Sequence, residues 1–592
     1  MSDLPRSASP SDTSASRWMN ATNMLGLIVA AGVLARVVQY AQRRPLFIDD
    51  VMLMLNIVTR GYRDLLRPLD MEQSAPPLFL WLQRFIVEAL GVSDVSFTLL
   101  SFIIGLAVLP MAWVVARRIV DRQSSMLTVA LLASSPPIIY YSTSAKQYEA
   151  DIFIALALSW LCFRVIDAPE RGARWVAAIA AGTIALALSM PALFVVGGVW
   201  CAWAVTRPIT ASARGRVFLL ASGALWGVTF VSLYVGVYSA VSRNDYMRRF
   251  WFGAFLNEQT SVGAALLYVS KGLQVSLFDV ESAIPWLLIG ALWMLMLTGV
   301  VSLVREKRYN VVALLTTPLL LAIAASALGQ WIVYTRFMLY SAPFVCVLVA
   351  HGLASTVRRW SVQGPYREGL VLAGALSVLA LPVKHSMWVL DHPASVEVSR
   401  ELLDDFNAHA QPAEPVYVYA RAMPLWTYYS VDWEHPDTLR VKRLLRDMVE
   451  IGPGSGNGPS RGYRVRHEGF ERRYPFRGSL ELVGISPGME LTGAFRAAAS
   501  DSGWAENEAE RIQSVASPTV WVAFAHHDPV PQTQLQEALA RLGGRVGFAD
   551  ERPGLALYRY RFDTSDSTTA GRSAGSSGSS VVASSVGGAN GR

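Results

Sequence analysis

Two adjacent carboxylates, Asp49 and Asp50, lie in the sequence FIDDVML, a few residues after the first long apolar segment. Ionisable groups at a bilayer surface are costly to keep there, and they usually serve a function. A partly desolvated carboxylate has a raised pKa, which suits it to remove a proton from a sugar hydroxyl. Alternatively, the pair caps a surface helix expected over residues 51–60, where the helix dipole favours negative charge.

A second polar group is the segment Tyr140–Asp151, YYSTSAKQYEAD, in which Lys146 is the sole cation. The preceding Ser-Ser-Pro-Pro at 134–137 is expected to break its helix, and irregular backbone at membrane depth usually lines a cavity. The alternative is a snorkelling lysine among interfacial tyrosines. From this segment and the first loop we take as substrate-binding candidates Gln73, Tyr141, Gln147, Tyr148 and Glu149.

Arginines supply a third set of candidates. Arg336 lies in QWIVYTRFMLY, and Arg248 and Arg249 lie in NDYMRRFWFGAF beside four aromatic residues. A guanidinium offers two parallel donors to phosphate oxygens. The alternatives are an interfacial anchor for Arg336 and a surface amphipathic helix for the arginine pair. The candidates for binding a phosphate are Lys146, Arg336 and Arg249.

The composition defines the class of protein. Apolar residues make up 52% of the 592 residues and charged residues only 16%, and apolar runs of membrane-spanning length recur. We therefore expect a polytopic α-helical membrane protein. The net charge of +7 does not indicate nucleic-acid binding, because the basic residues cluster in short loops between spans. The three cysteines, Cys162, Cys201 and Cys346, lie in apolar runs without metal-site or disulfide spacing.

About eleven spans are expected, at residues 23–41, 96–116, 124–141, 150–166, 174–189, 191–206, 216–238, 285–304, 311–328, 336–355 and 368–388. The even-numbered connections from the second to the tenth each carry three arginines or lysines, as in Arg305, Lys307 and Arg308. The positive-inside rule makes these connections cytoplasmic. The N-terminus is then cytoplasmic, and the segments holding Asp49, Lys146 and Arg336 lie outside the cell (inner or plasma) membrane.

Four regions follow from this pattern. We expect a disordered N-terminus (1–22), a membrane domain (23–389, with its first outer loop at 42–95), an extracytoplasmic α/β domain (390–563) and a disordered Ser/Gly-rich tail (564–592). In the α/β domain, strands are predicted at 414–420, 519–525, 545–550 and 556–562, and helices from MPLWTYYSV and over 532–542. A glycine-rich loop is predicted at 452–460.

Several other chemistries lack their motifs. The sequence has no P-loop, no GxGxxG after a strand, no GxSxG and no HExxH. His526, His527 and Asp528 have no partner cluster at metal-ligand spacing and are interpreted as a loop, so no metal site is predicted.

The order of motifs resembles a known group. RRPLFIDDVML, then QSAPPLFLWL, ARRIV, YYSTSAKQYEAD and a late YTRFMLYSAPF make the chain similar to GT-C glycosyltransferases of the protein O-mannosyltransferase, aminoarabinose transferase and RgtA/B/C/D-like group. The resemblance covers roughly residues 23–390 and is most specific in the first 150. The C-terminal domain resembles weakly the extracytoplasmic α/β domains of some members.

This resemblance implies inverting transfer of a sugar from a polyprenyl-phosphate donor to a glycan, lipid or protein acceptor. Asp49 would deprotonate the acceptor hydroxyl, and Asp50 would orient Asp49 or the acceptor. The group's usual Asp-Glu is Asp-Asp here, and Ser74 and Ala75 stand where some relatives carry a phosphate-binding lysine. Lys146 or Arg336 would then contact the donor phosphate. No cofactor is assigned, and a divalent cation stays open.

Two other classes remain as alternatives. A non-catalytic polyprenyl-lipid carrier protein or a transporter should place ionisable groups within spans and show two similar halves. Arg36 is the main such residue, lies near the end of its span, and no internal repeat is visible. A scaffold whose outer domain binds envelope glycans would leave both aspartates dispensable. The polar groups gathered on one side favour the enzyme.

Overall fold

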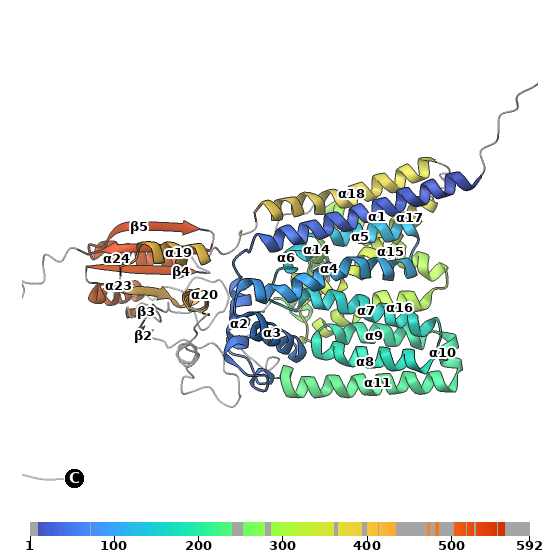
Figure 1. Cartoon of the computed structure of the whole chain (residues 1–592), viewed down its shortest axis with the longest axis horizontal. Coiled ribbons are helices and arrows are strands. Elements are labelled where there is room, and N and C mark those ends of the chain that lie inside the picture. The colour runs from blue at the N-terminus through green and yellow to red at the C-terminus, as the bar shows by residue number, and fades with distance from the viewer. Residues whose placement is uncertain are drawn as a thin grey trace, which may run out of the picture.

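The computed structural model describes residues 10–71, 73–239, 251, 253–278, 286–359, 365–392, 399–411, 414–431, 433, 470–473, 480–484, 503–516, 518–525, 529–552 and 554–562. A bundle of long helices forms one part of the molecule and a mixed sheet with its own helices forms the other (Figure 1). Arg249, the loop at 452–460, His526 to Asp528 and the tail at 564–592 lie outside the described residues.

The bundle contains α1 (Pro10–Ala41), α4 (Asp94–Ile119), α5 (Arg122–Ala133), α6 (Pro136–Tyr141), α7 (Tyr148–Ile166), α8 (Gly172–Leu188), α9 (Ala192–Ala204), α10 (Arg207–Ala211), α11 (Ala213–Leu233), α14 (Val262–Phe278), α15 (Trp286–Arg305), α16 (Tyr309–Ala327), α17 (Ala342–Arg359) and α18 (Pro365–Asp391). Among the described residues, seven helices are long and apolar enough to cross a membrane. The predicted class of multi-pass membrane protein is confirmed, while eleven crossings stay a prediction.

Two segments differ from the prediction. α1 begins at Pro10, inside the expected N-terminal tail, because hydropathy marks only the apolar part of a helix. α14 lies in the long connection expected outside the membrane and packs against α6 and the short helix η4 (Thr335–Ser341). α14 is apolar but short, with 17 residues, and Lys271 interrupts its apolar sequence. The expected break at Ser134 and Ser135 separates α5 from α6.

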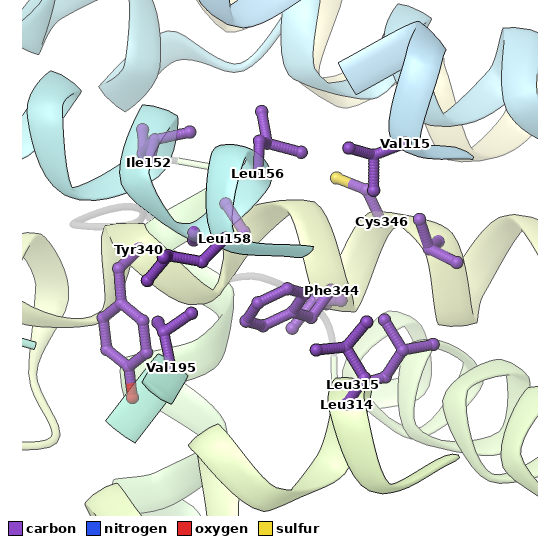
Figure 2. Close-up of a cluster of buried hydrophobic side chains, with 14 of the residues drawn as sticks. Val115, Ile152, Leu156, Leu158, Val195, Leu314, Leu315, Tyr340, Phe344 and Cys346 are labelled. Carbon is purple, nitrogen blue, oxygen red and sulfur yellow. The ribbon is translucent and has the colours of Figure 1, made fainter. Parts of the chain in front are cut away.

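The core of the bundle surrounds α17. Figure 2 shows side chains of α4, α7, α9, α16, η4 and α17 meeting there: Val115, Ile152, Leu156, Leu158, Val195, Leu314, Leu315, Tyr340, Phe344 and Cys346. Nearly all residues of α17 are buried, whereas only 11% of an apolar 18-residue segment within Gly369–Asp391 is buried. Lipid is as apolar as these side chains, so close packing is the main force that keeps α17 in the centre.

The arginine-rich connections meet at one end of the bundle. Arg118, in the last turn of α4, pairs with Asp167, directly after α7, at 2.7 Å. Arg308, before α16, donates to the main-chain carbonyl of Arg118 at 3.2 Å. Since α4 runs from Asp94 to Ile119, its first residue marks the opposite end, which faces the sheet domain (Figure 1). The predicted grouping of these connections is confirmed, and the assignment of that end to the cytoplasm stays a prediction.

The sheet domain contains α19 (Ser399–His409), β1 (Val416–Tyr419), α20 (Met423–Ser430), β2 (Phe470–Arg473), β3 (Leu480–Gly484), α23 (Trp504–Val515), β4 (Thr519–Ala525), α24 (Pro529–Arg541), β5 (Arg545–Arg552) and β6 (Leu555–Arg561). The strand order is β2-β3-β1-β4-β6-β5, with β1 parallel to β3 and β4. The predicted α/β domain is confirmed, although α19, α23, β2 and β3 were not predicted.

Successive side chains of a strand point to opposite faces of the sheet, and the two faces pack against different helices. Tyr417 and Val522 point toward α23 and α24. Val416 and Trp521 point the other way, toward α19, α20 and the first loop of the bundle. The second face of the sheet is therefore part of the contact between the two halves of the molecule.

The contact between α15 and α17 gives a first prediction. A Cβ atom at Gly352 would overlap the carbonyl oxygen of Leu295, whereas Gly290 has open space around its Cα. We expect Gly352→Ala to destabilise the bundle by about 1–3 kcal/mol through overpacking and to lower the thermal unfolding midpoint in detergent. Gly290→Ala is the control and should leave the midpoint unchanged or slightly higher. Equal midpoints for the two variants would contradict the close approach.

Candidate active site

Asp49 and Asp50 lie in the first turn of α2 (Ile48–Thr59), at the end of the bundle that faces the sheet domain (Figure 1). The N-cap residue is Phe47, and no side chain caps this helix. Neither aspartate is therefore the N-cap residue, but both lie in the first turn, where the helix dipole favours negative charge as the alternative interpretation expected. Successive residues of a helix point about 100° apart, so the two carboxylates face different surroundings.

Asp49 faces two cations. Its Oδ2 lies 2.8 Å from Nη2 of Arg336 and 3.7 Å from Nζ of Lys146. Gln73 donates from Nε2 to Oδ1 of Asp49 at 3.3 Å and accepts a hydrogen bond from Lys146 at 2.6 Å. Side chains from four distant parts of the sequence, all predicted as site residues, thus converge. The Asp49 side chain keeps 26% of its surface exposed, so this carboxylate is reachable.

Asp50 points into the protein. Only 4% of the residue is exposed, and Oγ of Ser144 donates to its Oδ1 at 2.8 Å. Burial raises the pKa of the Asp50 carboxyl, and the positive charges of Arg44 and Lys146 offset only part of this effect. Burial likewise lowers the pKa of the Lys146 ammonium, against the attraction of Asp49 and Asp50. Asp50 is placed to hold the segment that carries Lys146.

Arg44 was not predicted as a site residue. Its guanidinium lies 3.7 Å from the centroid of the Tyr140 ring, and Nε donates to Oγ1 of Thr143 at 3.1 Å. On the opposite side of this segment, Ser101 of α4 donates to the carbonyl of Lys146 at 3.1 Å. These contacts stabilise the irregular backbone around Lys146. The only signal in the sequence was the position of Arg44 just before the two aspartates.

The first loop returns to α2 through Asn56. Its side chain donates to the Asp70 carbonyl at 3.1 Å and accepts from the Asp70 N–H at 2.8 Å. Arg60 also pairs with the Asp70 carboxylate at 2.7 Å. Gln73 follows directly and reaches Asp49, before α3 (Pro77–Leu90) begins.

The other predicted substrate-binding residues differ in their placement. Tyr148 is buried, and its ring packs edge-on against Tyr141 at a centroid distance of 4.8 Å. Gln147 is the N-cap residue of α7, and Asp151 follows one turn later. Oε1 of Gln147 and Oδ1 of Asp151 are buried without a close hydrogen-bond partner among the described residues, and Ser189 lies near the Asp151 carboxyl.

Glu149 points elsewhere. Its carboxylate lies against Gly105 of α4 and interacts electrostatically with Arg36 of α1, so the structure does not bring it into the Asp49 cluster. One residue further along a helix turns a side chain by about 100°, which separates Glu149 from Tyr148. The described residues contain no group of three His, Cys, Asp or Glu side chains that could hold a metal ion.

This arrangement suits an anionic ligand beside a base. Arg336 and Lys146 supply charge-assisted donors to phosphate oxygens, and Asp49 is an acceptor for a hydroxyl proton. Tyr141 and Tyr148 add aromatic surface next to these charges.

A family model described as dolichyl-phosphate-mannose-protein mannosyltransferase matches residues 74–235. The predicted resemblance to GT-C glycosyltransferases of the protein mannosyltransferase and aminoarabinose transferase group is thereby confirmed. The matched segment includes Lys146 and Tyr148 but begins after Asp49 and Asp50 and ends before Arg336. No curated protein matches the chain at a significant level.

Solved structures of similar outline are distant in sequence. ArnT from Cupriavidus metallidurans bound to undecaprenyl phosphate is 12% identical, with 91% of this chain and 98% of that chain covered and a TM-score of 0.47. The same protein in the apo state gives 13% identity, the same coverages and a TM-score of 0.45. An Archaeoglobus fulgidus oligosaccharyltransferase in complex with Zn and sulfate gives 14% identity, coverages of 90% and 72%, and a TM-score of 0.44.

The burial of Asp50 predicts a pH dependence of stability. A carboxyl whose folded-state pKa is raised binds more protons when folded, so stability falls as pH rises from about 4, the unfolded pKa, to the folded pKa. In Asp50→Asn, the thermal unfolding midpoint should therefore decrease less with rising pH between these two pKa values than it does in the wild type. Asp64→Asn, at a side chain that is 55% exposed, is the control. If the midpoint of Asp50→Asn changed with pH as steeply as that of the wild type, the raised pKa of Asp50 would be contradicted.

Proposed function

We propose that the chain is an inverting glycosyltransferase (a hexosyl- or pentosyltransferase) that uses a polyprenyl-phosphate sugar. The acceptor is an envelope glycan, a lipid or a protein at the outer face of the cell membrane. The observation that carries the proposal is the placement of Asp49 beside both Arg336 and Lys146 at one end of a membrane bundle. The family match over residues 74–235 supports the same class of reaction.

The reaction begins when the donor phosphate replaces the Asp49 carboxylate as the partner of Arg336. Arg336 and Lys146 then stabilise the negative charge that grows on the phosphate as its bond to the anomeric carbon breaks. Asp49 removes the proton from an acceptor hydroxyl, whose oxygen attacks that carbon from the opposite face. A new glycosidic bond with inverted configuration forms, and the polyprenyl phosphate leaves.

The remaining groups position these three residues. Gln73 bonds both Asp49 and Lys146, and Asp50 bonds Ser144 of the segment that holds Lys146. We assign the side chain of Gln147, which follows Lys146 directly, to hydrogen bonds with sugar hydroxyls. The arginine-rich end of the bundle lies away from this site, which by the positive-inside rule supports an extracytoplasmic location for the sheet domain.

Asp49→Asn tests the assignment of the base. Because an amide accepts no proton, the turnover number should fall about 10²–10⁴-fold while the donor still binds. The measurement is sugar transfer by protein reconstituted in liposomes, with a panel of radiolabelled polyprenyl-phosphate sugars and acceptors. Asp64→Asn in the same loop is the control. A normally folded Asp49→Asn variant with full activity would refute the assignment.

Arg336→Gln and Lys146→Gln test the donor site. Losing one charge-assisted contact should weaken donor binding about 10- to 100-fold. Arg67→Gln, at a side chain that is 78% exposed, is the control for loss of charge. Donor affinity equal to that of the wild type in both site variants would place the phosphate elsewhere. Donor binding without turnover in the wild type, with every acceptor tried, would favour the carrier alternative.

A further inference from the structure

The sheet domain contacts the segment that leads directly into α2. Residues 42–47 connect α1 to α2, and two side chains of the sheet domain bond to the backbone there. Nη1 of Arg400, on α19, donates to the Arg43 carbonyl at 3.1 Å. The hydroxyl of Tyr429, on α20, accepts from the Leu46 N–H at 2.9 Å. Leu46 stands three residues before Asp49.

Both side chains are also bound to α4. Asp94, the first residue of that helix, accepts hydrogen bonds from Tyr428 at 2.9 Å and from Tyr429 at 3.2 Å, and it pairs with Arg400. The Asp94 side chain is 10% exposed, and hydrogen bonds in such a low-dielectric setting are stronger than in water. The Tyr429 hydroxyl thus joins the sheet domain, the bundle and the approach to α2 in one chain of bonds.

Apolar packing continues the same contact. Leu46, Val51 and Leu55 belong to one hydrophobic cluster with Phe406 and Trp426 of the sheet domain. Figure 1 shows α20 beside α2, and the two helices are in contact. The first-loop helix is therefore buried between the two halves of the molecule, and its position depends on both.

The connection needs external support. Arg43 has φ +48°, a left-handed conformation that is uncommon for a residue other than glycine. No regular secondary structure covers residues 44–47. Arg44 is fixed to Thr143 and Tyr140 on one side, and the bonds from Arg400 and Tyr429 restrain the backbone of this short stretch on the side of the sheet domain.

We propose that Tyr429 and Arg400 are positioning residues that set the place of Asp49 relative to Arg336 and Lys146. The sheet domain is then a component of the active site rather than a cover over it. The kinetic consequence rests on the proposed glycosyltransferase function, whereas the effect on the backbone does not. A displacement of about 1 Å at a reacting group costs about 10²-fold in rate.

The first test is hydrogen exchange of the full-length protein in lipid nanodiscs. Tyr429→Phe keeps the ring and removes the hydroxyl, so amides of residues 44–50 should exchange about tenfold faster. Tyr428→Phe loses only its bond to Asp94, and Tyr560→Phe lies on β6, away from α2, so both should exchange there like the wild type. Unchanged exchange in Tyr429→Phe would overturn the proposal. A rise spread over the whole sheet domain would also overturn it, since it would mark general destabilisation.

The second test is kinetic and uses the same variants. Tyr429→Phe should lower kcat about 10- to 100-fold with little change in donor KM, because the base moves while the phosphate site stays. Arg400→Gln should also lower kcat, and Arg400→Lys should have a kcat between those of Arg400→Gln and the wild type. Equal kcat values in Tyr429→Phe and Tyr560→Phe would overturn the positioning role. If the wild type transferred no sugar, the proposed function would fail, and hydrogen exchange would still decide whether Tyr429 holds residues 44–50.

Discussion

The structure depends on keeping a carboxylate and two cations together where little water reaches them. Removing such charges from water costs several kcal/mol per ion, and their attraction offsets this cost only with accurate geometry and further hydrogen bonds. Gln73 supplies such bonds to both Asp49 and Lys146. Three elements bring these charges together. α2 carries the carboxylate, the segment after α6 carries the lysine, and η4 carries the arginine.

The balance of charge around this cluster suits an anion. Arg44, Lys146 and Arg336 bring three positive charges, and the carboxyls of Asp49 and Asp50 bring at most two negative ones. Since burial raises the pKa of Asp50, protonation of that group would leave a larger positive excess. A phosphate monoester would neutralise this excess and would compete with Asp49 for Arg336. The ion pair between Asp49 and Arg336 would then be exchanged for a contact between Arg336 and the ligand.

Much of this arrangement could be predicted from the sequence. The alternation of arginine-rich connections correctly grouped Asp49, Lys146 and Arg336 at one end of the bundle. β1, β4, β5 and β6 were predicted because β-branched and aromatic residues alternate there. Arg44 was missed because its role depends on Tyr140 and Thr143, about a hundred residues away. The bond between Tyr429 and Leu46 spans 383 residues and leaves no local pattern.

Because α17 is enclosed by other helices, it should respond less than they do to changes in membrane thickness. Helices at the surface of a bundle adapt to membrane thickness by tilting. α17 is buried along almost its whole length, so lipid contacts other helices and not this one. Thickness and composition of the membrane can therefore change around the protein while Arg336, on η4 just before this central helix, keeps its position relative to Asp49. The relative position of Asp49 and Arg336 is thus determined by packing inside the protein and not by the lipid surface.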